Sequence, residues 1–164
     1  MKIHPLFQNF ALDDRRLWEI FEGLGSDIAV IAHVGAGGDA RVNALSSPAM
    51  VRQIVRQFSD LRLIVWHFGG YKLLDDAEEM LSGADVVLET SWPPSLSTPR
   101  PDRVRRLIQK HGADRVVFGS DWPMTSPGDE IVAVDALGLS DTETKHVLGG
   151  TLARILGVDS PWVT

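Results

Sequence analysis

The sequence predicts a parallel α/β fold, in which short strands alternate with helices and pair in one sheet. Three observations predict it. Short apolar runs rich in β-branched residues recur along the chain, amphipathic helical patterns separate them, and ionisable residues stand where the apolar runs end. Because the carboxyl ends of parallel strands meet at one rim of a sheet, the same pattern predicts where a functional site would form.

Five apolar runs are the predicted strands. They are apolar on both faces, as expected for strands of a parallel sheet that is covered on both sides. In chain order the runs are Lys2–His4, Ile28–His33, Leu61–His67, Asp85–Glu89 and Arg115–Phe118.

Amphipathic helical patterns lie between these runs, with apolar residues recurring every three or four positions. The patterns cover residues 14–24, 48–58, 73–81 and 102–110. In the second pattern, Ser47 followed by Pro48 predicts an N-cap with proline in the first turn. Ser140-Asp141-Thr142-Glu143 predicts a capping box that opens a C-terminal helix. The Pro- and Ser-rich stretch Ser91–Pro101 is predicted to be a loop.

The composition is that of one globular domain, predicted to extend over residues 1–164. Hydrophobic residues make up 44% of the chain and charged residues 23%, which is enough apolar material for a core. The net charge of −6 argues against broad nucleic-acid binding. The absence of cysteine excludes disulfides, thiolate metal ligands and a cysteine nucleophile. With no signal-like or membrane-length apolar run, we expect a cytoplasmic protein that does not enter membranes.

Ionisable side chains close the predicted strands. His4, His33 and His67 each end an apolar run, and Asp121 follows the last run. Burying such a group is costly without a partner, and two imidazoles with a carboxylate suit Zn²⁺ or a similar divalent ion. A single histidine at a strand end is more often a hydrogen-bonded structural residue. The prediction of a metal site therefore depends on the repetition of this feature at three strand ends.

Several other polar residues leave two interpretations open. Lys2 has the same strand parity as His4, so it points into a barrel or is simply a charged chain start. Glu89 closes the fourth run and either contacts a substrate or pairs with an arginine. His111 and His146 lie on helical patterns and are expected at the surface.

These motifs resemble those of the amidohydrolase superfamily. In order they are Lys-x-His-Pro, His-Val-Gly, His-Phe-Gly-Gly, Val-Leu-Glu-Thr-Ser and Phe-Gly-Ser-Asp-Trp-Pro, the last being the most specific. Within the superfamily the chain is similar to the amidohydrolase-related branch, which includes aminocarboxymuconate-semialdehyde-type decarboxylases and many metal-dependent hydrolases. The resemblance covers nearly the whole chain. It implies a partial (β/α)₈ TIM barrel, the fourth to eighth strands of the family barrel with helices outside.

The resemblance also implies residue roles. His33 resembles the fifth-strand metal ligand, and His67 the sixth-strand histidine that orients or activates the metal-bound water. Asp121 resembles the eighth-strand aspartate, which contacts metal or water and moves the proton. We therefore expect His33, His67 and Asp121 to bind a divalent metal, most simply zinc, with His67 and Asp121 catalytic. The candidate substrate-binding residues are Lys2, His4, Glu89 and Trp122.

The sequence also departs from the family. It lacks the His-x-His pair of the family's first strand, and the matching strands begin with the fourth, where Lys2 occupies a position that is a modified lysine in some relatives. Near the end, Gly150-Thr151-Leu152-Ala153-Arg154 stands where relatives have Gly-Asn-Ala-x-Arg. Five strands cannot close an eight-stranded barrel. We therefore expect the open edges to be hidden by homo-oligomerisation, by strand exchange or by a missing N-terminal fragment.

The implied function is that of a metal-dependent hydrolase, in which metal-activated water attacks a small carbonyl-type substrate. One alternative is a metal-dependent decarboxylase of the same family. Another is a non-catalytic remnant that acts through oligomerisation or partner binding. A third, unrelated alternative is a flavodoxin-like binding module, for which Gly35-Ala36-Gly37-Gly38 is the only candidate phosphate loop.

Overall fold

The computed structural model describes residues 1–159, which fall into two compact units. The first unit comprises Met1–Leu88, and the second begins at Glu89. The predicted single domain over residues 1–164 includes residues 160–164, which lie outside the described residues, and it stays a prediction.

All five predicted strands form, each shorter than its apolar run. They are β1 (Lys2–Ile3), β2 (Val30–Ala32), β3 (Leu63–Val65), β4 (Val87–Glu89) and β5 (Val116–Val117). The strand order is β1-β2-β3-β4-β5. The first three pairs are parallel, with Ile3 opposite Ala32 and Ala32 opposite Val65. The predicted parallel α/β class is therefore confirmed.

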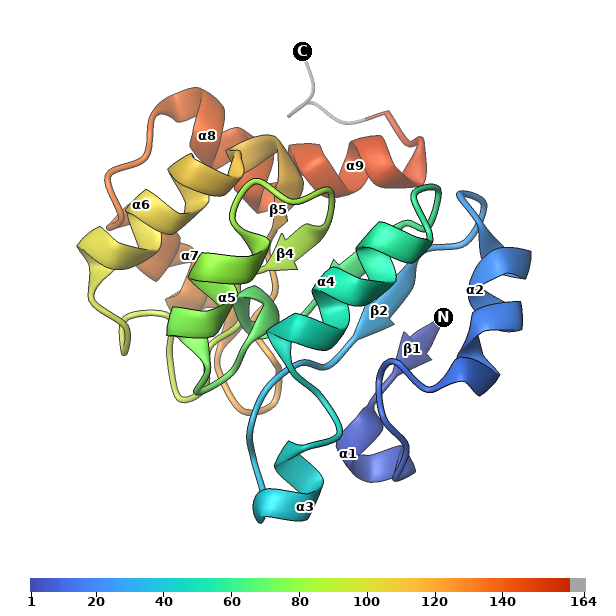
Figure 1. Cartoon of the computed structure of the whole chain (residues 1–164). Helices are drawn as coiled ribbons and strands as arrows, with labels where there is room; N and C mark the ends of the chain where they lie inside the picture. Colours follow the sequence, from blue (N-terminus) through green and yellow to red (C-terminus); the bar gives the residue numbers. More distant parts are fainter. Residues whose placement is uncertain (160–164) are drawn as a thin grey trace. The chain divides into compact units, whose positions relative to one another are not determined.

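The helical segments of the first unit follow its strands in alternation. They are α1 (Pro5–Gln8), η1 (Arg15–Leu17), α2 (Trp18–Leu24), α3 (Ala40–Asn43), α4 (Pro48–Gln57), η2 (His67–Gly69) and α5 (Leu74–Leu81). The neighbouring helices α4 and α5 pack against each other (Figure 1). The short helices α1 and α3 follow the carboxyl ends of β1 and β2 and lie at the same end of the unit, at the bottom of the view.

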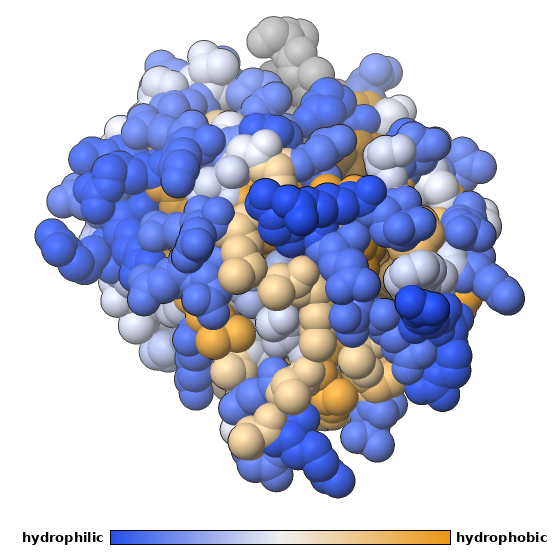
Figure 2. Space-filling model, viewed as in Figure 1, coloured by the Kyte–Doolittle hydropathy of each residue, from blue (hydrophilic) through white to orange (hydrophobic). Residues whose placement is uncertain are grey.

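Helix α4 separates a buried side from an exposed side as the sequence predicts. Val51 and Ile54 are almost fully buried, whereas Arg56 is exposed. Figure 2 shows strongly hydrophilic side chains over the outward side of this helix. Ser47 caps it, since its hydroxyl accepts a hydrogen bond from the Met50 amide at 3.4 Å, and Pro48 occupies the first turn.

The predicted apolar stripe in residues 14–24 is wrong at one position. Phe21 is buried and meets Phe58 edge to face, but Ile20 is 43% exposed. The segment begins as a 3₁₀ turn whose N-cap is Asp14, which accepts from the Arg16 amide. The pattern in residues 14–24 predicts Ile20 on one apolar stripe with Leu17, Phe21 and Leu24, and Ile20 is the member that the structure exposes.

The second unit contains the end of β4, β5 and the remaining helical segments. These are α6 (Pro101–His111), η3 (Ala113–Arg115), α7 (Pro127–Asp135), α8 (Asp141–Lys145), a π-helical segment η4 (His146–Gly150) and α9 (Thr151–Leu156). Of the stretch predicted as a loop, Ser91–Pro101, residues 91–100 contain neither helix nor strand, whereas Pro101 is the first residue of α6. The predicted capping box forms at α8, with Ser140 and Glu143 bonding each other's backbone amides.

One residue of the second unit, His111, differs from what its sequence position predicts. His111, expected at the surface, is fully buried at the end of α6, where its carbonyl accepts from the Arg115 guanidinium. Thr151, which stands where the family has asparagine, is also buried and donates its hydroxyl to the Ala113 carbonyl at 3.2 Å. Among residues 1–159 no helix is both long and apolar enough to cross a membrane.

Candidate functional site

The strand ends of the first unit bring three histidines together. His4 follows β1 and His33 follows β2 at the same level, because Ile3 lies opposite Ala32. Their rings stack, with centroids 4.2 Å apart and planes at 15°. His67, which follows β3, meets His33 edge to face at 4.9 Å between centroids. Parallel pairing thus turns three distant sequence positions into one cluster of imidazoles.

The backbone around this histidine cluster is fixed by hydrogen bonds. The His33 amide donates to the Ile3 carbonyl at 3.0 Å, and the His33 carbonyl accepts from the fully buried Ser46 hydroxyl at 2.9 Å. His67 and Phe68 both have positive φ angles, 57° and 52°. Side chains other than glycine rarely adopt this conformation, which costs about 1–3 kcal/mol and is typical of functional sites.

Tyr71 is a neighbour of the cluster that the sequence did not predict. Its ring lies 5.3 Å from that of His67. Its backbone forms a parallel bridge with Gly35, in which its amide donates to the Val34 carbonyl and its carbonyl accepts from the Ala36 amide. A Cβ at Gly35 would lie 2.5 Å from the Tyr71 backbone, so glycine is required there by space. The available sequence clue was the Gly69-Gly70 pair just before Tyr71.

The imidazole of His33 is held in its neutral form. Its pKa is lowered to about 3, chiefly by burial and then by the electrostatic effect of the neighbouring His67, His4 and Lys2. Its Nδ1 atom is buried and has no hydrogen-bond partner among the described residues. A neutral imidazole with an unused buried nitrogen fits a divalent metal ligand. A preformed cage is not seen, since no three His, Cys, Asp or Glu side chains within residues 1–159 are placed to hold a metal together.

Lys2 lies beside this cluster. Strand alternation puts Lys2 on the same face as His4, and its ammonium sits over the Trp66 ring in a cation–π contact. Lys2 as a whole residue is exposed. The first unit therefore presents a positively charged group next to three imidazoles.

The glycine-rich loop after β2 is filled by a side chain. The amides of Gly37 and Gly38 both donate to Oδ1 of Asn43 at 2.9 Å, and Nδ2 of Asn43 donates to the Gly38 carbonyl. These amides are the groups that would cradle a phosphate. Their use by Asn43 argues against the flavodoxin-like alternative.

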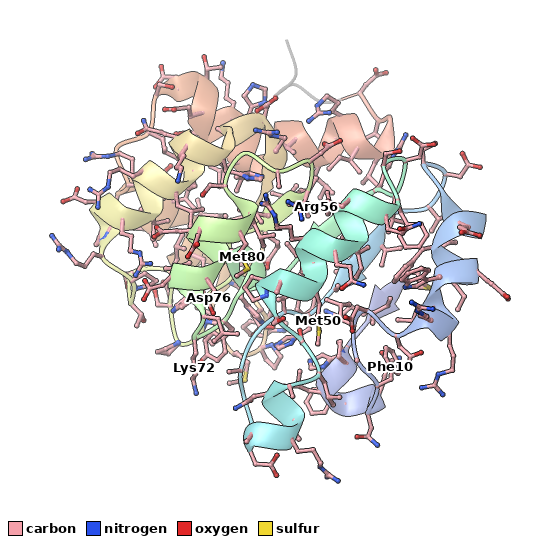
Figure 3. The ribbon with its side chains drawn as sticks, in the orientation of Figure 1. Phe10, Met50, Arg56, Lys72, Asp76 and Met80 are labelled. Atoms are coloured by element: carbon pink, nitrogen blue, oxygen red, sulfur yellow. The ribbon has the colours of Figure 1, made fainter. Side chains whose placement is uncertain are left out.

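A separate surface groove of about 660 Å³ lies between α4 and α5. Figure 3 labels Arg56 of α4 and Met80 of α5 on these two facing helices. The groove contains none of the predicted site residues, and the Arg52 guanidinium in its wall already donates to the Met80 carbonyl. This groove therefore adds no support to the predicted site residues.

In the second unit, the strand ends carry carboxyl and hydroxyl groups. Glu89, the last residue of β4, is 6% exposed, and its two carboxylate oxygens accept from the Ser91 amide at 3.0 Å and the Ser91 hydroxyl at 2.7 Å. The Thr90 amide donates to the Val117 carbonyl of β5 at 3.0 Å. The Thr90 hydroxyl both accepts from the Gly119 amide and donates to the Gly119 carbonyl, each at 3.1 Å.

Asp121 and Trp122 follow β5 in the same unit. Asp121 has a φ of 60°, and its carbonyl accepts from the Met124 amide at 2.8 Å in a tight turn. Trp122 is 71% exposed. Of the predicted metal-binding residues, His33 and His67 therefore lie together in the first unit and Asp121 lies in the second. Their meeting at one rim stays a prediction.

The sequence as a whole matches a known family. The amidohydrolase family model matches residues 1–158, nearly the full length. The chain belongs to the amidohydrolase family. No curated protein matches it.

Solved structures similar to this amidohydrolase chain share its fold at low identity. An uncharacterized TIM-barrel protein from Bordetella bronchiseptica is 21% identical, with a TM-score of 0.68 over 90% of this chain and 52% of its own. An amidohydrolase from Burkholderia multivorans with bound zinc is 18% identical, with a TM-score of 0.64 over 90% and 59%. A dihydroxybenzoic acid decarboxylase from a Polaromonas species, with bound manganese and 2-nitroresorcinol, is 16% identical, with a TM-score of 0.65 over 90% and 55%.

These matches confirm the predicted partial TIM-barrel fold class. The chain spans about half the length of the solved structures that it matches. Two of those structures hold zinc or manganese, so divalent metals occur among the relatives of this chain. The identity of a metal here, and the reaction, belong to the proposal below.

Proposed function

We propose that this chain carries part of the active site of a metal-dependent hydrolase that acts on a small carbonyl-type substrate. The observation that supports it most is the neutral, buried imidazole of His33 beside His67, at the strand ends of an amidohydrolase chain. Asp121 is included because the Phe-Gly-Ser-Asp-Trp-Pro motif resembles the family's eighth-strand motif.

In this proposal, His33, His67 and Asp121 hold a divalent cation, zinc in the simplest case. When bound, such a cation supplies Lewis acidity that polarises a carbonyl group and acidifies water. His67 and Asp121 accept and return the proton during attack and leaving-group departure. Lys2 and His4 of the first unit, and Trp122 of the second, bind the substrate.

Decarboxylation is the second candidate reaction. It is favoured by the structural similarity to decarboxylases, including the manganese-bound dihydroxybenzoic acid decarboxylase. The positive charge of Lys2 suits a carboxylate substrate of either reaction, so it does not separate them. A panel of activated esters and lactones against hydroxybenzoates, read by acid release and by CO₂ release, separates the two.

The metal site is tested by metal content. Wild-type protein, His33→Ala and the control His146→Ala are loaded with Zn²⁺ or Mn²⁺, dialysed and measured by elemental analysis and by calorimetric titration. His146 lies in η4 of the second unit and is not one of the predicted ligands. We expect His33→Ala to lose at least tenfold in metal affinity and His146→Ala to keep the wild-type value. Equal metal content in all three proteins would remove His33 from the ligand set.

We also propose that the chain is a homo-oligomer in the cytoplasm. The described sheet has five strands, and its open edges favour association. Light scattering should give a mass above the 18.0 kDa of one chain. A single species at 18.0 kDa over the micromolar range would contradict the proposal.

A further inference from the structure

The carboxylate of Glu89 accepts two hydrogen bonds from its neighbour Ser91. Both oxygens accept hydrogen bonds from Ser91, one from the amide and one from the hydroxyl. Glu89 and Ser91 are 6% and 1% exposed, so this arrangement is buried. A carboxylate fixed in this way is held in one orientation and is better suited to support another residue than to bind a substrate directly.

Gly119 lies directly against this carboxylate. A Cβ at Gly119 would lie 1.7 Å from Oε1 of Glu89 and 2.6 Å from its carboxyl carbon. The φ angle of Gly119 lies outside the left-handed range, so backbone conformation does not require glycine here. Glycine is required because there is no space for a side chain. The carboxylate therefore occupies the space that a side chain at position 119 would need.

Thr90 holds Gly119 from another direction. Its hydroxyl bonds both the amide and the carbonyl of Gly119, and its own amide bonds the carbonyl of Val117. Two residues beyond Gly119, Asp121 adopts a φ of 60°. A residue other than glycine keeps such a conformation only when its surroundings over-determine it.

We propose that Glu89 is a positioning residue, which presses on Gly119 and so sets the backbone that presents Asp121. This assigns Glu89 a role different from substrate contact. The inference rests on the proposed function only for the role of Asp121 in metal binding and proton transfer. The positioning of the backbone is independent of any metal or substrate.

Backbone resonances of the metal-free protein test the positioning. Gly119→Ala should shift the ¹H–¹⁵N signals of Asp121 and Trp122, because the new methyl group displaces the backbone from Glu89. The double variant Glu89→Ala/Gly119→Ala should shift them less, because the methyl group fills the space that the carboxylate leaves. The control is Gly128→Ala at the start of α7, where a Cβ would meet only Ser126 Oγ at 3.8 Å and should leave these signals in place.

The variant Glu89→Gln keeps the side-chain shape and provides a second test of the positioning if Gly119→Ala does not fold. It should also shift the Asp121 and Trp122 signals, because a carboxamide cannot accept both Ser91 bonds at full strength. In the folded variant, Mn²⁺ affinity should fall about tenfold to a hundredfold, the usual cost of changing a residue that orients a ligand. Signal changes confined to residues 89–91 and 118–119 would overturn the inference. Absence of Mn²⁺ binding by the wild type would refute the proposed function. The positioning role of Glu89 would still be decided by the resonance test, which uses the metal-free protein.

Discussion

In the first unit the strand-end side chains are rings that pack on one another, whereas in the second they are a carboxylate and hydroxyls joined by hydrogen bonds. The difference follows from charge. The buried His33 imidazole is neutral, so packing is enough to hold it. A buried carboxylate such as Glu89 needs hydrogen bonds to offset its lost hydration. We therefore expect the first unit to be most sensitive to added volume, and the second to the loss of a hydrogen-bonding group.

The largest effect is expected from Gly35→Ala in the first unit. The new Cβ would overlap the Tyr71 backbone, at a φ of 139° that alanine avoids. We expect the free energy of unfolding to fall by about 3 kcal/mol, measured by urea denaturation. Gly23→Ala is the matched control, because no atom lies within 4 Å of the added Cβ. It should be neutral or slightly stabilising in helix α2. Equal losses of unfolding free energy in both variants would contradict the expectation that the first unit is most sensitive to added volume.

Glu130→Ala should have the next largest effect, in the second unit. Glu130 is 1% exposed and accepts from the Ser95 hydroxyl at 2.9 Å and the Leu96 amide at 2.8 Å. Its removal leaves buried donors unsatisfied, which costs about 2 kcal/mol and should loosen the loop after β4. Unfolding measurements and limited proteolysis of that loop check this. The exposed neighbour Asp129→Ala should change neither; a loss of stability as large as that of Glu130→Ala would argue against a hydrogen-bonding cause.

Ser140→Ala removes one half of the capping box at α8. We expect a loss of about 1 kcal/mol, the usual cost of deleting an N-cap hydroxyl. Thr142→Ala, exposed in the same turn, is the control and should stay within about 0.5 kcal/mol of the wild type. A wild-type melting temperature for Ser140→Ala would show that the cap is dispensable.

The smallest expected effect is on the melting temperature at acidic pH. Hydrogen bonds from Arg16 lower the pKa of Asp14 from 3.8 to about 2. Because the folded-state pKa is the lower one, the contribution of Asp14 is present above pH 3.8 and is lost as the pH falls towards 2. The melting temperatures of wild type and Asp14→Asn should therefore differ slightly at pH 5 and converge near pH 2. A constant difference across this range would assign the effect to packing.

Local patterns were enough to predict the strands, most helices and the histidine cluster. Parallel strands put His4, His33 and His67 at equivalent ends, so their approach follows from the order of the apolar runs. The contact between Glu89 and Gly119 was not predictable, because it joins residues 30 positions apart through the absence of a side chain. Tyr71 was missed for a similar reason, since its contact depends on how closely two loops approach.

The burial of His111 was predictable and was missed. Val104, Leu107, Ile108 and His111 occupy one side of α6 at helical spacing, and all four are buried. Because histidine was treated as a polar surface residue, His111 was not recognised as the fourth member of this buried stripe. The burial of a histidine seven residues after the first member of such a stripe is better predicted from its position on the helix than from its polarity.

The bridge between Gly35 and Tyr71 has a consequence for redesign. Loops after barrel strands are the usual places to graft new specificity, and each is normally exchanged alone. Here the turn after β2 and the turn after β3 share backbone hydrogen bonds and a contact with no room for a methyl group. An engineer who replaces one turn must carry the other with it, so the two form a single exchangeable cassette.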